Sequence, residues 1–203
     1  MSNLFDRISS ALKDVFLPFP SSWERTLGRG QYFVVLSPST QEYTDVQTMF
    51  LRTSGPCIVT QIKRVQNLAL YRMTEAYKEK IAEETRSTCN NVQRQLWHGT
   101  SGSNVQLICA NGFSRSYAKP GLAIGQGTYF STTSQGSMSY AGDSSIILAR
   151  VTVGRYVQGA SGMTQQTLPS GYHSTVNITE CPQVFVVYHD AAAYPEYIIS
   201  FRR

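Results

Sequence analysis

The sequence predicts an α+β fold made of two antiparallel β-sheets with peripheral helices. Apolar residues make up 41% of the 203 residues and charged residues 15%, a balance that allows one large hydrophobic core. Strand-like and helix-like patterns alternate in the first half of the chain, whereas the second half holds a run of strand-like segments. This arrangement is typical of α+β proteins.

The chain is predicted to comprise residues 1–22, an amphipathic helix with a linker, and residues 23–203, one folded domain. Residues 3–16 place apolar side chains at helical spacing, and Pro18 and Pro20 end that helix. Acidic and basic residues balance along this segment. We therefore expect the helix to dock on the main domain rather than to contact a membrane surface or another chain.

The first half of the domain predicts two strands and two helices. Gln31–Ser37 is a strand, and Ser39–Arg52 is a helix capped by its first or second residue. Cys57–Val65 alternates apolar with polar residues, as a partly exposed strand does. Leu68–Thr85 repeats apolar residues every three or four positions and is the clearest helix of the chain.

The remaining elements are mostly strands. Gln95–His98 is a strand, and Ser103–Ala110 is a helix that Asn111-Gly112 ends. Further strands are predicted at Ser145–Val153, Arg155–Gln158, Tyr172–Asn177, Val184–Tyr188 and Glu196–Phe201.

Composition argues against several kinds of site. Four cysteines and three histidines lie scattered without C-x-x-C or zinc-finger spacing, so we predict no metal site. The first residues carry charges where a signal peptide needs an apolar stretch, and no apolar run reaches the roughly 18 residues of a membrane span. We expect free thiols, an intracellular location (cytoplasmic or nuclear) and a monomer.

The formal net charge of +5 favours anionic partners such as a dinucleotide. Basic residues adjoin only at Lys63-Arg64 and Arg202-Arg203, so the chain lacks the basic run of a nucleic-acid-binding arm. Binding to nucleic acid is therefore allowed but not favoured.

Two segments carry candidate chemistry: Leu96–Thr100 (LWHGT) and Gly125–Ser131 (GQGTYFS), the second followed by Ser137 and Tyr140. The second segment lacks the third glycine of a dinucleotide-binding G-x-G-x-x-G and leads into a strand, where that motif needs a helix. No P-loop is present either. If the protein handles NAD, we expect it to cleave NAD as a substrate.

These residues are the types needed to hold an aromatic cation that carries an amide. Gly99 can offer its N–H and C=O to the amide because no side chain blocks close approach, and Ser137 can add a hydroxyl. Tyr129 and Tyr140 can sandwich the ring, and a ring nitrogen of His98 can bond a ribose hydroxyl. Each residue alone has an ordinary structural explanation; their agreement in order and spacing favours a site.

In LWHGT and GQGTYFS the chain resembles the poly(ADP-ribose) polymerase family of ADP-ribosyltransferases, from Trp23 to Arg203. The resemblance is strongest to macrodomain-associated mono-ADP-ribosylating members. It implies the ADP-ribosyltransferase fold and NAD as substrate. By this resemblance, His98 matches the histidine that binds the nicotinamide ribose.

The resemblance also implies other contacts to NAD. Tyr129 matches the tyrosine of the second motif, and Ser137 and Tyr140 match the serine that holds the carboxamide and the tyrosine that stacks on the ring. Gly99 and Thr100, which follow the histidine, would complete the NAD contacts of the first motif. Asn111–Ala118 resembles the start of the donor-site loop, so Arg115 would reach a phosphate.

One position departs from the chain-elongating members of the family. They carry a catalytic glutamate where this chain has Val184. A valine cannot bond the ribose 2′-hydroxyl or polarise the hydroxyl of an incoming ADP-ribose, so the resemblance implies transfer of one unit only. Glu180 is not expected to replace the glutamate, because side chains alternate along a strand and Pro182 intervenes. Glu196 is expected to be a surface or hydrogen-bonding residue of the last strand.

About twenty residues precede Trp23, too few for the helical regulatory domain of DNA-activated members. We therefore expect constitutive NAD binding, controlled if at all by partners or by motion of Ser114–Ile124.

The leading hypothesis is transfer of ADP-ribose from NAD to a protein side chain, including those of the chain itself, with release of nicotinamide. An acceptor carboxylate would supply the missing polarisation, which favours Glu or Asp. The alternatives are modification of nucleic acid ends, a non-catalytic NAD or ADP-ribose binding module, and NAD hydrolysis.

Overall fold

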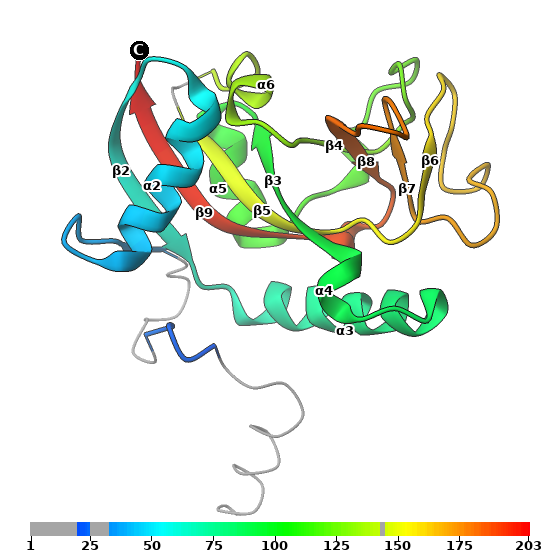
Figure 1. Ribbon diagram of the computed structural model, residues 1–203, viewed down its shortest axis with the longest axis horizontal. Helices are drawn as coiled ribbons and strands as arrows, with labels where there is room; N and C mark the ends of the chain where they lie inside the picture. Colours follow the sequence, from blue (N-terminus) through cyan, green and yellow to red (C-terminus); the bar gives the residue numbers. More distant parts are fainter. Residues whose placement is uncertain (1–19, 25–32, 143–144) are drawn as a thin grey trace, which may run out of the picture. The chain divides into compact units, whose positions relative to one another are not determined.

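The computed structural model describes residues 20–24, 33–142 and 145–203. Its strands form one hydrogen-bonded order, β1-β2-β9-β5-β3-β4-β8-β7-β6 (Figure 1). The strand bounds are β1 Phe33–Val35, β2 Ile58–Val65, β3 Gln93–Gly99, β4 Thr128–Ser131, β5 Ser145–Thr152, β6 Tyr156–Gln158, β7 Ser174–Val176, β8 Val184–Val187 and β9 Ala193–Arg202.

The two predicted sheets are the two halves of this order. Strands β1-β2-β9-β5-β3 make the first half and β4-β8-β7-β6 the second, and a single residue pair, Trp97 with Ser131, joins β3 to β4. The expected antiparallel pairing holds at every junction except β6–β7, which is parallel. The described strands therefore form one continuous sheet where two were predicted, because the Trp97–Ser131 pair joins the two halves.

The three helices predicted between residues 39 and 110 are present within a residue or two of their expected bounds. They are α2 (Gln41–Ser54), α3 (Leu68–Thr85) and α5 (Gly102–Asn111). Thr40 caps α2 by accepting the N–H of Tyr43, and Gly112 follows α5. Four short elements were not predicted: α4 (Cys89–Val92), α6 (Ser134–Met138), and the 3₁₀ turns η1 (Arg115–Tyr117) and η2 (Asp190–Ala192).

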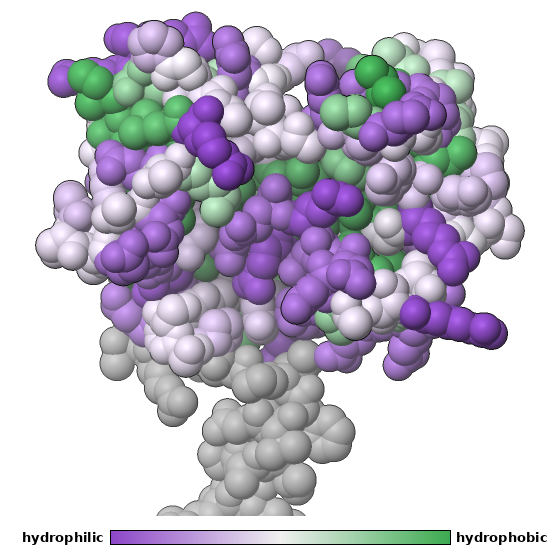
Figure 2. Space-filling view, in the orientation of Figure 1, coloured by the Kyte–Doolittle hydropathy of each residue, from purple (hydrophilic) through white to green (hydrophobic). Residues whose placement is uncertain are grey.

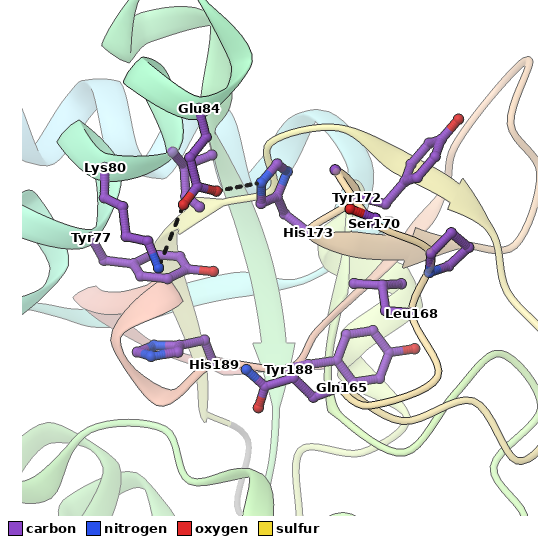
Figure 3. A pocket seen from close by; sticks show the side chains of 13 residues that line it. Tyr77, Lys80, Glu84, Gln165, Leu168, Ser170, Tyr172, His173, Tyr188 and His189 are labelled. Carbon is purple, nitrogen blue, oxygen red and sulfur yellow. Dashed lines mark hydrogen bonds and ion pairs between the residues drawn. The ribbon is translucent and has the colours of Figure 1, made fainter.

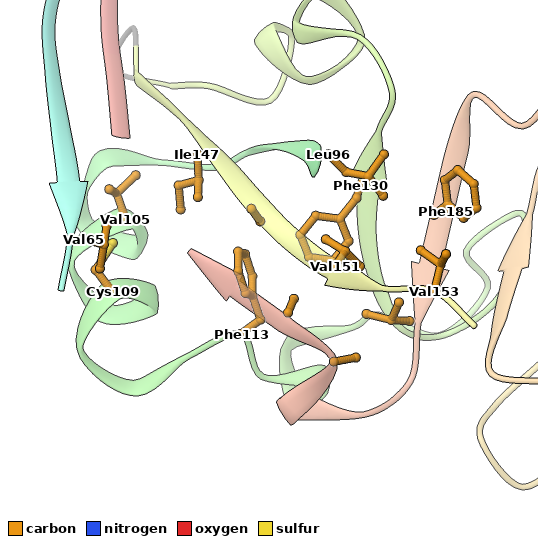
Figure 4. Close-up of a cluster of buried hydrophobic side chains, with 14 of the residues drawn as sticks. Val65, Leu96, Val105, Cys109, Phe113, Phe130, Ile147, Val151, Val153 and Phe185 are labelled. Carbon is orange, nitrogen blue, oxygen red and sulfur yellow. The ribbon is translucent and has the colours of Figure 1, made fainter. Parts of the chain in front are cut away.

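Helices cover both faces of the first half, so its strand β5 is buried on both sides. Ile146 and Leu148 pack into the cluster that includes Tyr43, Val46 and Phe50 of α2. Ile147, Ala149 and Val151 pack into the opposite cluster, which includes Val105 and Cys109 of α5 (Figure 4). A strand covered on both faces reads as a continuous apolar run, as Ile146–Ala149 (IILA) does within β5.

The chain forms two compact units, Met1–Gln31 and Tyr32–Arg203. The predicted amphipathic helix at 3–16 lies outside the described residues, and the predicted start of the domain at Trp23 remains a prediction. Cys57, Cys89, Cys109 and Cys181 are free, as expected.

Within the described ranges, no helix combines the length and the apolar character needed to span a bilayer. No group of His, Cys, Asp and Glu in those ranges is arranged to hold a metal ion. On the face drawn in Figure 2, hydrophilic residues are widespread and apolar residues reach the surface in separate patches.

Candidate active site

The site lies at the seam between the two halves of the sheet. Beyond the Trp97–Ser131 pair the strands β3 and β4 part, and the ring of His98 bridges them. Its Nδ1 lies 2.9 Å from the carbonyl oxygen of Tyr129. Because a carbonyl only accepts, Nδ1 carries the proton, and Nε2 of the neutral ring is left as an acceptor. Such an acceptor suits a ribose hydroxyl.

Aromatic neighbours set the orientation of this imidazole. The ring of His98 meets Phe113 edge-on at 5.1 Å and Phe130 at 5.4 Å between centroids, and those two rings are 5.0 Å apart. Burial lowers the pKa of His98 below its ordinary 6.5, while the bond to the Tyr129 carbonyl opposes this in part. The imidazole is therefore neutral at physiological pH.

Gly99 is required by its contact with α6. A Cβ at this position would lie 1.9 Å from the carbonyl oxygen of Ser137 and 3.1 Å from the Cβ of Tyr140. The glycine thus lets α6 approach β3 and bring Ser137 and Tyr140 beside it, in addition to leaving its own backbone open to a ligand. Any side chain at residue 99 would disturb the site before it filled a ligand pocket.

Ser137 is oriented by the chain that precedes His98. Its buried hydroxyl donates to the carbonyl oxygen of Trp97 at 2.9 Å, so the oxygen lone pairs remain as acceptors. The short helix α6 is held in turn by Ser134, whose hydroxyl donates to the carbonyl oxygen of Phe50 at 2.8 Å. An acceptor beside the Gly99 backbone suits the N–H₂ group of a carboxamide.

The two tyrosines of the predicted sandwich differ in exposure. Tyr140 is 71% exposed, whereas Tyr129 is half-buried and its hydroxyl donates to the carbonyl oxygen of Gly125 at 2.9 Å. Burial raises the pKa of Tyr129, the hydrogen bond from the Ile124 N–H opposes this in part, and the phenol of Tyr140 adds a smaller increase. The structure therefore brings His98, Gly99, Tyr129, Ser137 and Tyr140 together.

The glycines of GQGTYFS are explained by close packing that the sequence did not reveal. Gly125 has φ of +125°, and a Cβ there would lie 1.9 Å from the hydroxyl of Tyr188. A Cβ at Gly127 would lie 2.4 Å from the carbonyl oxygen of Val187. The end of the 114–127 loop therefore lies directly against the end of β8.

The side chains of Arg115 and Thr100 each make hydrogen bonds to other residues of the protein. A guanidinium nitrogen of Arg115 donates to Gln165 Oε1 at 2.5 Å and to the carbonyl oxygen of Tyr188 at 2.9 Å. Thr100 Oγ1 accepts from Asn104 Nδ2 at 3.2 Å. The predicted contact of Arg115 with a phosphate would have to compete with or share these bonds, and it stays a prediction.

Val184 lies in one row with Trp97 and Ser131 across three strands. Opposite residues of an antiparallel pair share a face and alternate residues repeat it, so Val184 and Tyr129 are on the same face. Glu180 is exposed, four residues before this row. Glu196 bonds Gln95 at 2.9 Å and Arg150 at 3.1 Å, the hydrogen-bonding role predicted for it.

A second, polar cleft lies between α3 and the 165–173 loop, and the sequence analysis did not single it out (Figure 3). Glu84 lies between His173 at 3.1 Å and Lys80 at 3.6 Å. The rings of Tyr77 and His189 stack at 4.4 Å between centroids. Burial, aided by Glu84, raises the pKa of Tyr77 to about 12. The two carboxylate oxygens of Glu84 thus face partners within this cleft.

The sequence from residue 40 to residue 203 matches the family model described as the poly(ADP-ribose) polymerase catalytic domain. The chain belongs to this family. Membership in this family agrees with the geometry of the seam, where residues of LWHGT and GQGTYFS meet. It also assigns the mixed α/β architecture with its nine-stranded order to the poly(ADP-ribose) polymerase catalytic fold.

Similar proteins carry the same family name. The protein mono-ADP-ribosyltransferase PARP14 of Homo sapiens is 31% identical over 198 residues, which cover 91% of this chain and 11% of that protein. PARP12 of Homo sapiens is 33% identical over 178 residues, 83% of this chain and 25% of that protein. PARP11 of Mus musculus is 29% identical over 216 aligned positions. The chain thus spans a minor part of the first two relatives.

Proposed function

We propose that this protein is a mono-ADP-ribosyltransferase that moves ADP-ribose from NAD to a protein side chain. The observation that carries the proposal is the seam, where His98, Gly99 and Ser137 present acceptors and a backbone edge beside two tyrosines. The relatives named as protein mono-ADP-ribosyltransferases support the same activity.

The reaction needs little general acid catalysis from the protein. The bond between C1′ of the ribose and the nicotinamide nitrogen breaks, and its electron pair stays on nicotinamide, which leaves as a neutral amide. Positive charge then develops on the ribose, and an acceptor oxygen forms the new bond to C1′. Catalysis therefore depends on holding nicotinamide, ribose and acceptor in line.

Each residue of the seam has a role in that positioning. The backbone of Gly99 and the hydroxyl of Ser137 would hold the carboxamide, and Tyr129 and Tyr140 would flank the cationic ring. Nε2 of His98 would accept from a ribose hydroxyl and fix the sugar. Thr100 and Arg115 would contact more distant parts of the dinucleotide.

Val184 determines the number of units transferred in this proposal. Its alkyl side chain supplies neither a hydrogen-bond acceptor for the 2′-hydroxyl nor a base for a second ADP-ribose. An acceptor that brings its own carboxylate needs no such base, so Glu and Asp side chains are the preferred acceptors. We propose further that the acceptors include the chain itself and that it acts as an intracellular monomer, in the cytoplasm or nucleus.

The direct test incubates the purified protein with NAD labelled in the adenylate and follows the label by denaturing gel and intact mass. We expect mass gains of separate single ADP-ribose units, absent in His98→Ala and sensitive to acceptor Glu and Asp replacement. Label at serine or cysteine alone would contradict the acceptor class. NAD binding without label on any protein acceptor would instead favour a binding module, and label on added nucleic acid ends would contradict the protein acceptor.

A further inference from the structure

A turn at Ile124 and Gly125 connects the 114–127 loop to the site. The backbone N–H of Ile124 donates to the hydroxyl of Tyr129 at 3.2 Å, and that hydroxyl donates to the carbonyl oxygen of Gly125 at 2.9 Å. The phenol of Tyr129 is thus bonded at both of its hydrogen-bonding positions to this turn. The position of this turn therefore helps to set the position of the Tyr129 ring.

Two further hydroxyls, those of Thr175 and Tyr188, contact the same turn. Thr175 Oγ1 lies 2.6 Å from the carbonyl oxygen of Ile124 and 2.8 Å from the hydroxyl of Tyr188. Since the threonine has one proton and the carbonyl can only accept, Thr175 donates to Ile124 and Tyr188 donates to Thr175. The Tyr188 hydroxyl also lies 3.4 Å from the Ile124 carbonyl oxygen.

These two hydroxyls are buried and come from strands outside both sequence motifs. Thr175 of β7 is fully buried, and Tyr188, just after β8, is 2% exposed. Burial raises the pKa of Tyr188, which keeps its hydroxyl protonated as a donor. Glycines let the partners meet, because a Cβ at Gly125 would strike the Tyr188 hydroxyl and one at Gly159 would lie 2.4 Å from the Ile124 carbonyl oxygen.

We propose that Thr175 and Tyr188 are positioning residues for NAD, which hold the Ile124–Gly125 turn and through it the ring of Tyr129. This inference rests on the proposed function, in which that ring flanks nicotinamide. Hydroxyls that place a ring for the bound substrate act on ground state and transition state alike. Their loss is therefore expected in KM for NAD, with kcat nearly unchanged.

The chain offers a matched set of threonine variants. Thr175→Val removes the hydroxyl at nearly constant shape, and Thr175→Ser keeps it. Thr152 is equally buried, but its hydroxyl has no hydrogen-bond partner among the described residues, so Thr152→Val is the control. Nicotinamide release from NAD gives KM and kcat for each full-length variant, and thermal unfolding reports their folding.

We expect Thr175→Val to raise KM about tenfold with kcat within about twofold, the size of the lost hydrogen bond to the Ile124 carbonyl. Thr175→Ser should restore KM, and Thr152→Val should leave it at the wild-type value. Hydrogen exchange of the Ile124 amide should quicken in Thr175→Val only. If Thr175→Val fails to fold, Tyr188→Phe takes its place, with an expected rise in KM of about threefold.

Two results would overturn the inference. One is a Thr175→Val protein with wild-type KM and a lowered melting temperature, since its hydroxyl would then serve folding alone. The other is a raised KM that Thr175→Ser does not restore. A wild-type protein that releases no nicotinamide would contradict the proposed function instead, and benzamide binding by calorimetry would still report whether Thr175→Val weakens the ring subsite.

Discussion

The two halves of the sheet are built differently, and the site lies where they meet. Strands β2, β9, β5 and β3 are seven to ten residues long and pair along most of their length, with α2 and α5 on opposite faces. Strands β4, β8, β7 and β6 are three or four residues long and alternate with long loops. The first half supplies His98, Gly99 and a firm support for α6, whereas the second supplies Tyr129 through a chain of loop contacts.

The two halves of the sheet are therefore expected to contribute differently to NAD binding at the seam. The residues proposed to hold the carboxamide lie against the long strands of the first half, so their geometry is expected to be insensitive to single surface changes. The side proposed to flank the ring depends on a few buried hydroxyls and glycines, and small changes there are expected to alter NAD affinity.

Removing side-chain volume should produce the largest difference in stability between the two halves. Leu148→Ala, in fully buried β5, should lower the free energy of unfolding by about 3–4 kcal/mol because it leaves a cavity covered from both faces. Val157→Ala, in the half-buried edge strand β6, should cost less than about 1 kcal/mol. Urea unfolding measures both, and equal costs would remove the distinction between the halves.

Removing the imidazole that bridges the seam should affect activity more than folding. His98→Ala should reduce ADP-ribose transfer about 100-fold, because the ribose is no longer fixed at C1′. His189→Ala, in the second cleft, serves as a histidine control and should retain activity. Transfer by His98→Ala at the wild-type rate would exclude the ribose-holding role.

A methyl group at Gly99 should move α6 away from β3. Because its Cβ would meet the backbone oxygen of Ser137, Gly99→Ala should cost about 2 kcal/mol of stability and abolish benzamide binding. At Gly142, near the same helix in sequence, the nearest atom would be 3.7 Å from a new Cβ. Gly142→Ala should therefore bind benzamide normally by calorimetry; retained binding in Gly99→Ala would show that α6 yields without loss of the clamp.

The pH dependence of the seam follows from His98. Its folded pKa is lowered below the unfolded value of about 6.5, so the unfolded chain binds more protons between these two values. The stability that the neutral ring contributes is fully present above about pH 6.5 and is lost as pH falls toward the folded pKa. Transfer should be level above about pH 6.5 and decline below the folded pKa, as Nε2 is protonated. Steady-state rates measure this profile, and an unchanged acid limb in the residual activity of His98→Gln would assign it to another group.

The smallest expected effect is a gain. Thr152 ends β5 with a buried hydroxyl that lacks a partner in the described ranges, so Thr152→Val should raise the free energy of unfolding by up to about 1 kcal/mol. Thermal unfolding at fixed pH measures it. A loss of stability would indicate that an ordered water satisfies the hydroxyl.

Local patterns in the sequence determined most of the secondary structure. The apolar repeat at Leu68–Thr85 predicted α3 with its observed bounds. Asn111-Gly112 predicted the end of α5, and Gly112 follows that helix. The short helix α6 was missed because five residues are too few for a periodic pattern to develop. The two motifs also identified the residues that meet at the seam, while their contacts with NAD remain predictions.

Contacts between segments distant in sequence became visible only in the folded structure. Residue types gave no sign that β3 and β4 join at one pair, that Gly99 faces the backbone of Ser137, or that Gly125 faces Tyr188. Nor could they connect Thr175 to Tyr129 through a turn fifty residues away. Periodicity reports which face of an element is buried, because burial acts on each element separately. Which groups then meet depends on strand order and close packing, and these are properties of the whole fold.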